Sequence, residues 1–113
     1  MRRSKLIVIA VGVAVSCSLA SGQGKKGAKA GDASKGQEVF QQCSVCHNAD
    51  STEKKMGPGL KGLFQHETLS NGKKPTEANV RAKIDEGGNG MPSYKEMLSD
   101  EEKDNLIAYL KTL

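Results

Sequence analysis

The residues with the clearest chemical potential are Cys43, Cys46 and His47, in the order Cys-Ser-Val-Cys-His. Two thiols at this spacing can add to the two vinyl groups on one edge of a porphyrin and form two thioether bonds. The adjacent imidazole can then bind the iron beneath the ring. This order is the attachment signal of a c-type haem. The motif therefore predicts one covalently bound haem c, with His47 as an iron ligand.

Other uses of a cysteine pair fit this chain less well. A thioredoxin-like redox pair needs a βαβ pattern, and no stretch of this sequence alternates for long like a strand. A structural zinc site needs a second pair of ligands, and His66 is the only strong ligand left outside the motif. A lone disulfide would leave His47 without a role. We expect His66 to be a solvated surface residue.

The start of the chain is typical of an exported protein. A basic N-terminus precedes an apolar run over residues 6–15, which is the pattern of a secretory signal peptide. The run is shorter than the roughly 20 apolar residues that a membrane span needs. We predict a signal peptide over residues 1–20 and a location in the periplasm. The alternatives are a lipoprotein signal over residues 1–16 with lipidated Cys17, which gives a membrane tether, and an uncleaved anchor.

The rest of the chain divides into a short linker and one domain. Residues 21–31 are rich in Gly, Ala and Ser and predict a flexible linker. Residues 32–113 form the domain. The whole chain has a formal net charge of +4, but from residue 31 onward 11 basic residues face 13 acidic ones, a net charge of −2. Nucleic-acid binding needs a clustered positive surface, so we expect no nucleic-acid partner.

Three stretches have the capping residues and apolar spacing of helices. Asp32 or Ser34 can cap a helix that runs to about residue 43, and Thr76 can cap a second that ends before Gly87. Ser99, with a glutamate three residues later, predicts a capping box at the start of the last helix. Residues 60–64 predict a short apolar turn. The expected fold class is all-α, with three to four helices joined by long loops.

The domain is small and poor in aromatic residues, with two Tyr, two Phe and no Trp in the chain. Domains of this size often need an additional stabilising element, such as a disulfide or a bound metal. A covalently bound macrocycle would supply the missing core, and the long loops would wrap around it. Gly36 weakens the first predicted helix by about 1 kcal/mol relative to Ala. A close helix crossing over Gly36 would explain why this position has no side chain.

These features resemble class I cytochromes c, and the resemblance covers residues 31–113. Gly36 and Phe40 are similar to the family's Gly-x-x-x-aromatic pattern in its N-terminal helix. Leu106 and Tyr109 resemble the residues of the C-terminal helix that cross it. The resemblance implies the cytochrome c fold, in which three to four helices and long loops wrap around one covalently bound haem.

The resemblance also implies the surroundings of the iron. The segment around Pro58 is similar to the family's Gly-Pro-x-Leu loop, in which the proline carbonyl accepts a hydrogen bond from the proximal imidazole, here His47. Met91, between Gly90 and Pro92, lies where the family places its methionine ligand. The nearby glycines allow the backbone to approach the haem closely. Met97 and His66 are the alternative distal ligands, and we expect Met97 to belong to the core.

A His47–Met91 pair would fill both axial positions of the iron and favour electron transfer over catalysis. A thioether donor favours ferrous iron and raises the reduction potential. The resemblance implies a monomeric carrier that forms transient complexes with redox proteins. Lysines in the loops are candidates for the docking surface, with scattered solvated charge as the alternative: Lys54, Lys55, Lys61, Lys73 and Lys74.

Two other functions stay open at this stage. One is a small electron-entry cytochrome subunit of a larger dehydrogenase or oxidase complex. A haem peroxidase or a haem sensor fits less well. A peroxidase needs an open sixth site, which Met91 would fill, and a sensor needs an output domain, for which the chain is too short.

Overall fold

The computed structural model describes residues 31–113. The predicted signal peptide, the alternative lipidation at Cys17 and nearly all of the predicted linker lie outside the described residues. The element order is helix α1 (Ala33–Phe40), 3-10 helix η1 (Leu63–Gln65), helix α2 (Glu77–Glu86) and helix α3 (Asp100–Leu110). This part of the chain contains no strand, so the predicted all-α class is confirmed. Among residues 31–113, no helix has the length and apolar character that a membrane span requires.

Helix α1 begins at the predicted cap and ends earlier than predicted. Asp32 is the N-cap, and its carboxylate accepts hydrogen bonds from the backbone N–H groups of Ser34 and Lys35 at 2.8 and 3.3 Å. The α-helix stops at Phe40 rather than near Cys43. From there the backbone bonds include the shorter i−3 type, as between Cys43 N–H and the Phe40 carbonyl at 2.8 Å. The chain therefore tightens into turns as it enters the cysteine motif.

The caps of the other two helices are those that the sequence predicts. The Thr76 hydroxyl accepts from Asn79 N–H at 3.1 Å, and Gly87 ends α2 with a φ of 66°. At α3 the Ser99 hydroxyl accepts from Glu102 N–H at 3.1 Å, while the Glu102 carboxylate accepts from Ser99 N–H at 2.7 Å. This reciprocal pair is the predicted capping box, and such caps are typically worth about 1 kcal/mol each.

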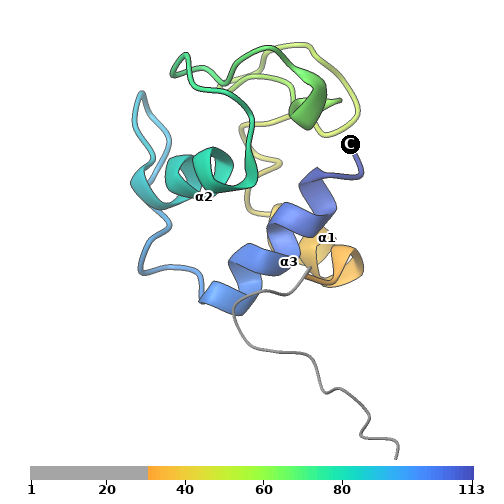
Figure 1. Ribbon diagram of the computed structural model, residues 1–113, viewed down its shortest axis with the longest axis vertical. Coiled ribbons are helices and arrows are strands. Elements are labelled where there is room, and N and C mark those ends of the chain that lie inside the picture. Colours follow the sequence, from red (N-terminus) through yellow and green to blue (C-terminus); the bar gives the residue numbers. More distant parts are fainter. Residues whose placement is uncertain (1–30) are drawn as a thin grey trace, which may run out of the picture.

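Helices α1 and α3 cross in close contact at one side of the molecule (Figure 1). A Cβ atom added to Gly36 would lie 1.9 Å from the Asn105 carbonyl oxygen and 2.8 Å from Tyr109 Cβ. The rings of Phe40 and Tyr109 pack with their centroids 5.2 Å apart. Asp32 N–H also donates to the Asn105 side-chain oxygen at 2.8 Å. The crossing explains Gly36, because only a residue without a side chain permits this approach.

The remaining elements face this helix pair from the other side. Figure 1 shows the long segment between α1 and α2, which contains η1, arching away from the crossing, with α2 beside it. The predicted apolar turn at residues 60–64 overlaps η1 only at residues 63 and 64, and Leu63 is buried there. The buried apolar side chains form one cluster: Phe40, Leu63, Val80, Ile84, Tyr94, Leu98, Leu106, Ile107 and Leu110.

Candidate haem site

A cavity of about 710 Å³ lies between the helix pair and the loops. This size falls within the roughly 300 to 1,000 Å³ typical of ligand and cofactor pockets. Its lining combines the predicted site residues with core side chains from every helical element. The apolar side chains in the lining include Phe40, Leu60, Leu63, Leu69, Val80, Ile84, Leu106 and Leu110. A domain this small therefore has a cavity of cofactor size beside its core.

The cysteine motif forms one part of the cavity wall. Backbone bonds from Cys46 N–H and His47 N–H to the Cys43 carbonyl, at 3.1 and 3.0 Å, wind the motif into a tight turn. Both cysteines and His47 line the cavity, whereas Val45 between them is 70% exposed. Before attachment, burial and then the neighbouring Cys46 raise the pKa of the Cys43 thiol to about 11. The turn thus presents the three reactive side chains on one side.

A hydrogen bond fixes the orientation of the His47 imidazole. Its Nδ1 lies 2.8 Å from the Pro58 carbonyl oxygen. A carbonyl can only accept, so Nδ1 carries the proton and Nε2 is left with a lone pair for a metal. Gly57 lies directly against this ring, because a Cβ there would be 2.5 Å from His47 Cε1. The predicted contact between His47 and Pro58 is present, while iron ligation by His47 stays a prediction.

Met91 lines the same cavity from a segment 44 residues further along the chain. It follows a tight turn in which Gly88 N–H donates to the Met91 carbonyl at 2.9 Å and Met91 N–H donates to the Gly88 carbonyl at 3.1 Å. Asn89 and Gly90 have φ values of 52° and 90°, which allow this reversal. The Met91 side chain is half-buried and packs against the core cluster. Its role as the sixth ligand remains a prediction.

The other methionines of the domain are placed differently. Met97 is 61% exposed, so the prediction that it belongs to the core is wrong. The turn after Met91 buries Tyr94 and Leu98, and Leu98 N–H donates to the Tyr94 carbonyl at 3.1 Å. This spacing turns Met97 outward. Met56 is 77% exposed and lines the cavity next to Gly57, which contacts the His47 ring.

Two residues at the cavity were not predicted to be there. His66 is half-buried rather than solvated, because η1 turns it inward, and its Nε2 lies 2.8 Å from the Lys61 carbonyl oxygen. Tyr94 is 8% exposed, and burial, followed by the Cys43 and Cys46 thiolates, raises the pKa of its phenol. The apolar i, i+4 spacing of Tyr94 and Leu98 is the sequence signal that can identify Tyr94 as buried.

The donor set and lining fit a c-type haem. The two thiols and the imidazole come from one turn of the chain, and a thioether comes from a distant loop into the same cavity. The rest of the lining is largely apolar, as a porphyrin face requires. Among the described residues there is no group of three or more His, Cys, Asp or Glu side chains that can hold a bare metal ion. The donor set and the apolar lining together favour a porphyrin-bound metal.

Comparisons with known proteins agree with this chemistry. The family model of cytochrome c matches residues 33–113. Cytochrome c2 of Rhodospirillum rubrum is 31% identical over an alignment of 132 positions, gaps included, which covers 93% of this chain and 96% of that protein. Cytochrome c-550 of Bacillus subtilis is 38% identical over 77 residues, covering 66% of this chain and 57% of that protein. The structure of cytochrome c6 from the diatom Phaeodactylum tricornutum is similar, with a TM-score of 0.58, 29% identity and coverage of 73% and 93%.

Proposed function

Because this chain belongs to the cytochrome c family and carries one covalently attached haem c, we propose that it is a periplasmic or membrane-tethered single-electron carrier. In this proposal His47 and Met91 bind the iron. The observation that carries the proposal is the convergence of these two side chains, from segments 44 residues apart, on one cavity. Its relatives are small electron-carrying cytochromes rather than enzymes, which supports the same conclusion.

The side of the cavity formed by the cysteine motif and the loop at Gly57 and Pro58, which we call the proximal wall, would hold the cofactor through several residues. Cys43 and Cys46 anchor the porphyrin by two thioether bonds, so that it cannot dissociate between electron transfers. His47 offers Nε2 to the iron, and the Pro58 carbonyl holds Nδ1–H at 2.8 Å. Such a hydrogen bond fixes the ring orientation and raises the basicity of the ligand. Gly57 keeps the space in which this ring lies.

The remaining lining determines what the bound haem can do. When bound, haem supplies a one-electron couple at its iron. Met91 would hold the iron through its thioether, which would favour the ferrous state and exclude small ligands. The apolar side chains keep water away from the ring. With His47 and Met91 both holding the iron, the protein around it would need to rearrange little during electron transfer.

We propose that redox proteins dock transiently where the motif reaches the surface. Val45 is exposed within the motif, and Lys54 lies at the cavity with its side chain exposed. Lys55 Nζ donates to the Ser44 carbonyl at 3.1 Å, which places a positive charge beside the attachment turn. Lys61, Lys73 and Lys74 are also exposed. Small, weak interfaces are typical of redox encounters.

The ligand set can be tested by optical spectroscopy of the exported, matured protein. We expect a weak far-red charge-transfer band in the ferric wild type, loss of this band in Met91→Ala, and its retention in Met97→Ala. The second variant is a matched control, since Met97 lies in the same loop but is 61% exposed. A high-spin ferric spectrum in the wild type would contradict the proposal, because it would mean an open sixth site and favour a peroxidase or a sensor.

A further inference from the structure

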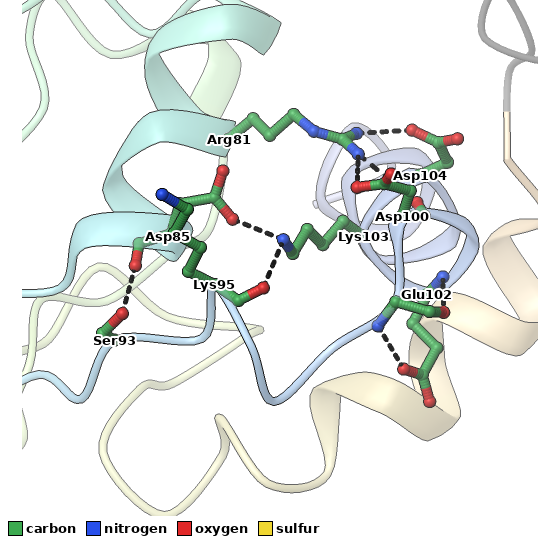
Figure 2. Close-up of polar contacts among 9 residues, drawn as sticks. Arg81, Asp85, Ser93, Lys95, Asp100, Glu102, Lys103 and Asp104 are labelled. Atoms are coloured by element: carbon green, nitrogen blue, oxygen red, sulfur yellow. Dashed lines mark hydrogen bonds and ion pairs between the residues drawn. The ribbon is translucent and has the colours of Figure 1, made fainter.

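Lys103 is a buried cation that the proposed function leaves unexplained. It lies on α3 and is only 4% exposed. Figure 2 shows its ammonium group between two partners, the Asp85 carboxylate at 2.7 Å and the Lys95 carbonyl oxygen at 3.0 Å. Lysine is almost never fully buried unless it is paired. The three residues come from α3, from α2 and from the loop that carries Met91.

The loop over residues 87–98, which we call the methionine loop, is tied to the helices at several points. Beside the contact to Lys95, Ser93 Oγ donates to the Asp85 carbonyl at 2.5 Å (Figure 2). Tyr94 N–H donates to the Ile84 carbonyl at 3.0 Å. Lys83 Nζ donates to the Gly87 carbonyl at 2.9 Å. The loop is thus held on both sides of Met91, and the contact from Lys103 is the one that links it to α3 through a buried charge.

The energetics of such a contact favour a role in positioning. A buried ion pair adds little stability over a well-packed apolar replacement, because both charges lose their hydration. Removing only one partner is nevertheless costly, because the other charge remains buried. Lys103 also donates a hydrogen bond to a backbone carbonyl of the loop. An apolar residue cannot replace this bond. Its contacts therefore fix where the loop lies against α2 and α3.

We propose that Lys103 is a positioning residue that keeps the methionine loop closed, so that Met91 stays on the iron. The inference rests on the proposed function, since it assumes that Met91 is the sixth ligand. An external ligand can bind the iron only in molecules in which Met91 has moved away. Its apparent affinity is therefore the intrinsic affinity multiplied by the fraction of molecules with an open loop. Weakening the Lys103 contacts raises that fraction.

The test is a titration of the ferric holoprotein with imidazole, followed by the loss of the far-red band. We compare the wild type with Lys103→Met, which keeps the aliphatic stem, and with Ser93→Ala, a milder change at the loop itself. We expect imidazole to bind about tenfold more tightly to Lys103→Met and about threefold more tightly to Ser93→Ala. Ser93 is exposed, so its variant is expected to fold and shows whether loosening the methionine loop alone admits imidazole. If Lys103→Met does not fold, Asp85→Asn, which removes the charge partner of Lys103, replaces it with the same expected rise.

Arg81→Met is the matched control. Arg81 lies one turn before Asp85 on α2 and pairs with Asp104 and Asp100 at the start of α3, but with no residue of the methionine loop (Figure 2). We expect its imidazole affinity to stay within about twofold of the wild type. The inference would be overturned if Ser93→Ala and Lys103→Met bound imidazole with the same affinity as the wild type. It would also be overturned if the imidazole affinity of Arg81→Met rose as much as that of Lys103→Met, because Lys103 would then act only on global stability.

The outcome also separates this inference from the proposed function. A far-red band in the wild type, with no change in imidazole affinity among the variants, would leave Met91 as the ligand and refute the role of Lys103. A wild-type protein without that band would refute the ligation by Met91 and, with it, the role of the loop. The expected order of affinities supports both.

Discussion

The helix crossing and the cavity wall are two halves of one core with different partners. At the crossing, protein packs on protein: Gly36 lies against the Asn105 backbone, and the rings of Phe40 and Tyr109 touch. Around the cavity, apolar side chains such as Leu63 and Val80 face about 710 Å³ of space that the cofactor must fill. The first half is complete in the polypeptide itself. The second half is complete only when the haem is attached.

Preventing haem attachment should affect the cavity wall far more than the helix crossing. Without the haem, the apolar side chains that line this cavity would face water instead of the porphyrin, and their burial would no longer stabilise the fold. The net stability of a domain is typically only about 5–15 kcal/mol, so this loss is large in comparison. We expect Cys43→Ala/Cys46→Ala to lose cooperative unfolding, measured by urea denaturation. Residual protection from amide hydrogen exchange should remain highest in α1 and α3.

A double variant that unfolded cooperatively, with native side-chain order around the cavity, would contradict the division of the core. The control is the wild type expressed with its haem, which should show one sharp transition for all elements. Equal loss of protection in α1, α3 and the loops would also contradict it, because the crossing would then depend on the cofactor as much as the cavity wall does.

A substitution at the crossing should weaken the domain without changing the haem spectrum. In Gly36→Ala the new Cβ would meet the Asn105 carbonyl oxygen, which belongs to a helix backbone and cannot move freely. Such overpacking typically costs about 1 to 3 kcal/mol. We expect a fall of this size in the urea unfolding free energy of the holoprotein. Gln37→Ala, at the exposed next position, should change it little, and a shifted haem spectrum in Gly36→Ala would argue against the separation.

A substitution in the proximal wall should have only a small effect on stability. In Gly57→Ala the new Cβ would lie 2.5 Å from His47 Cε1, so the ring must shift and its hydrogen bond to Pro58 must lengthen. We expect a stability loss of about 1 kcal/mol, the value of one hydrogen bond, and a changed reduction potential measured by redox titration. Met56→Ala, at the exposed neighbour, is the control. An unchanged potential would mean that the ring position is not tuned by this contact.

The sequence predicted the parts of this structure that depend on local chemistry. The caps at Asp32, Thr76 and Ser99 follow from side-chain hydrogen bonds over three residues, and the Cys43–His47 motif follows from its spacing. The crossing at Gly36 was predicted because a glycine within a helix needs a reason. The family resemblance added the contact between His47 and Pro58, which no local pattern shows.

The parts that the sequence did not predict depend on how the loops turn. Whether Met97 or Leu98 points inward is decided by one residue of register after Tyr94, and both are apolar. The orientation of His66 depends on η1, a single short turn. Lys103 resembles a surface lysine in sequence, because its partners Asp85 and Lys95 come together only in the folded chain. These features are tertiary, so periodicity alone cannot reveal them.

The hydrogen bond between Asp32 and Asn105 has a consequence for the order of assembly. It joins residues 73 positions apart, so the crossing forms only after a long loop closes. Contacts between residues so far apart in sequence form slowly, because the chain loses the entropy of loop closure before the contact stabilises it. The cysteine turn lies close to the N-terminal partner of this contact, and α3 arrives last as the chain is made. We therefore expect the two thiols to stay accessible to the haem until α3 docks on α1 and closes the core.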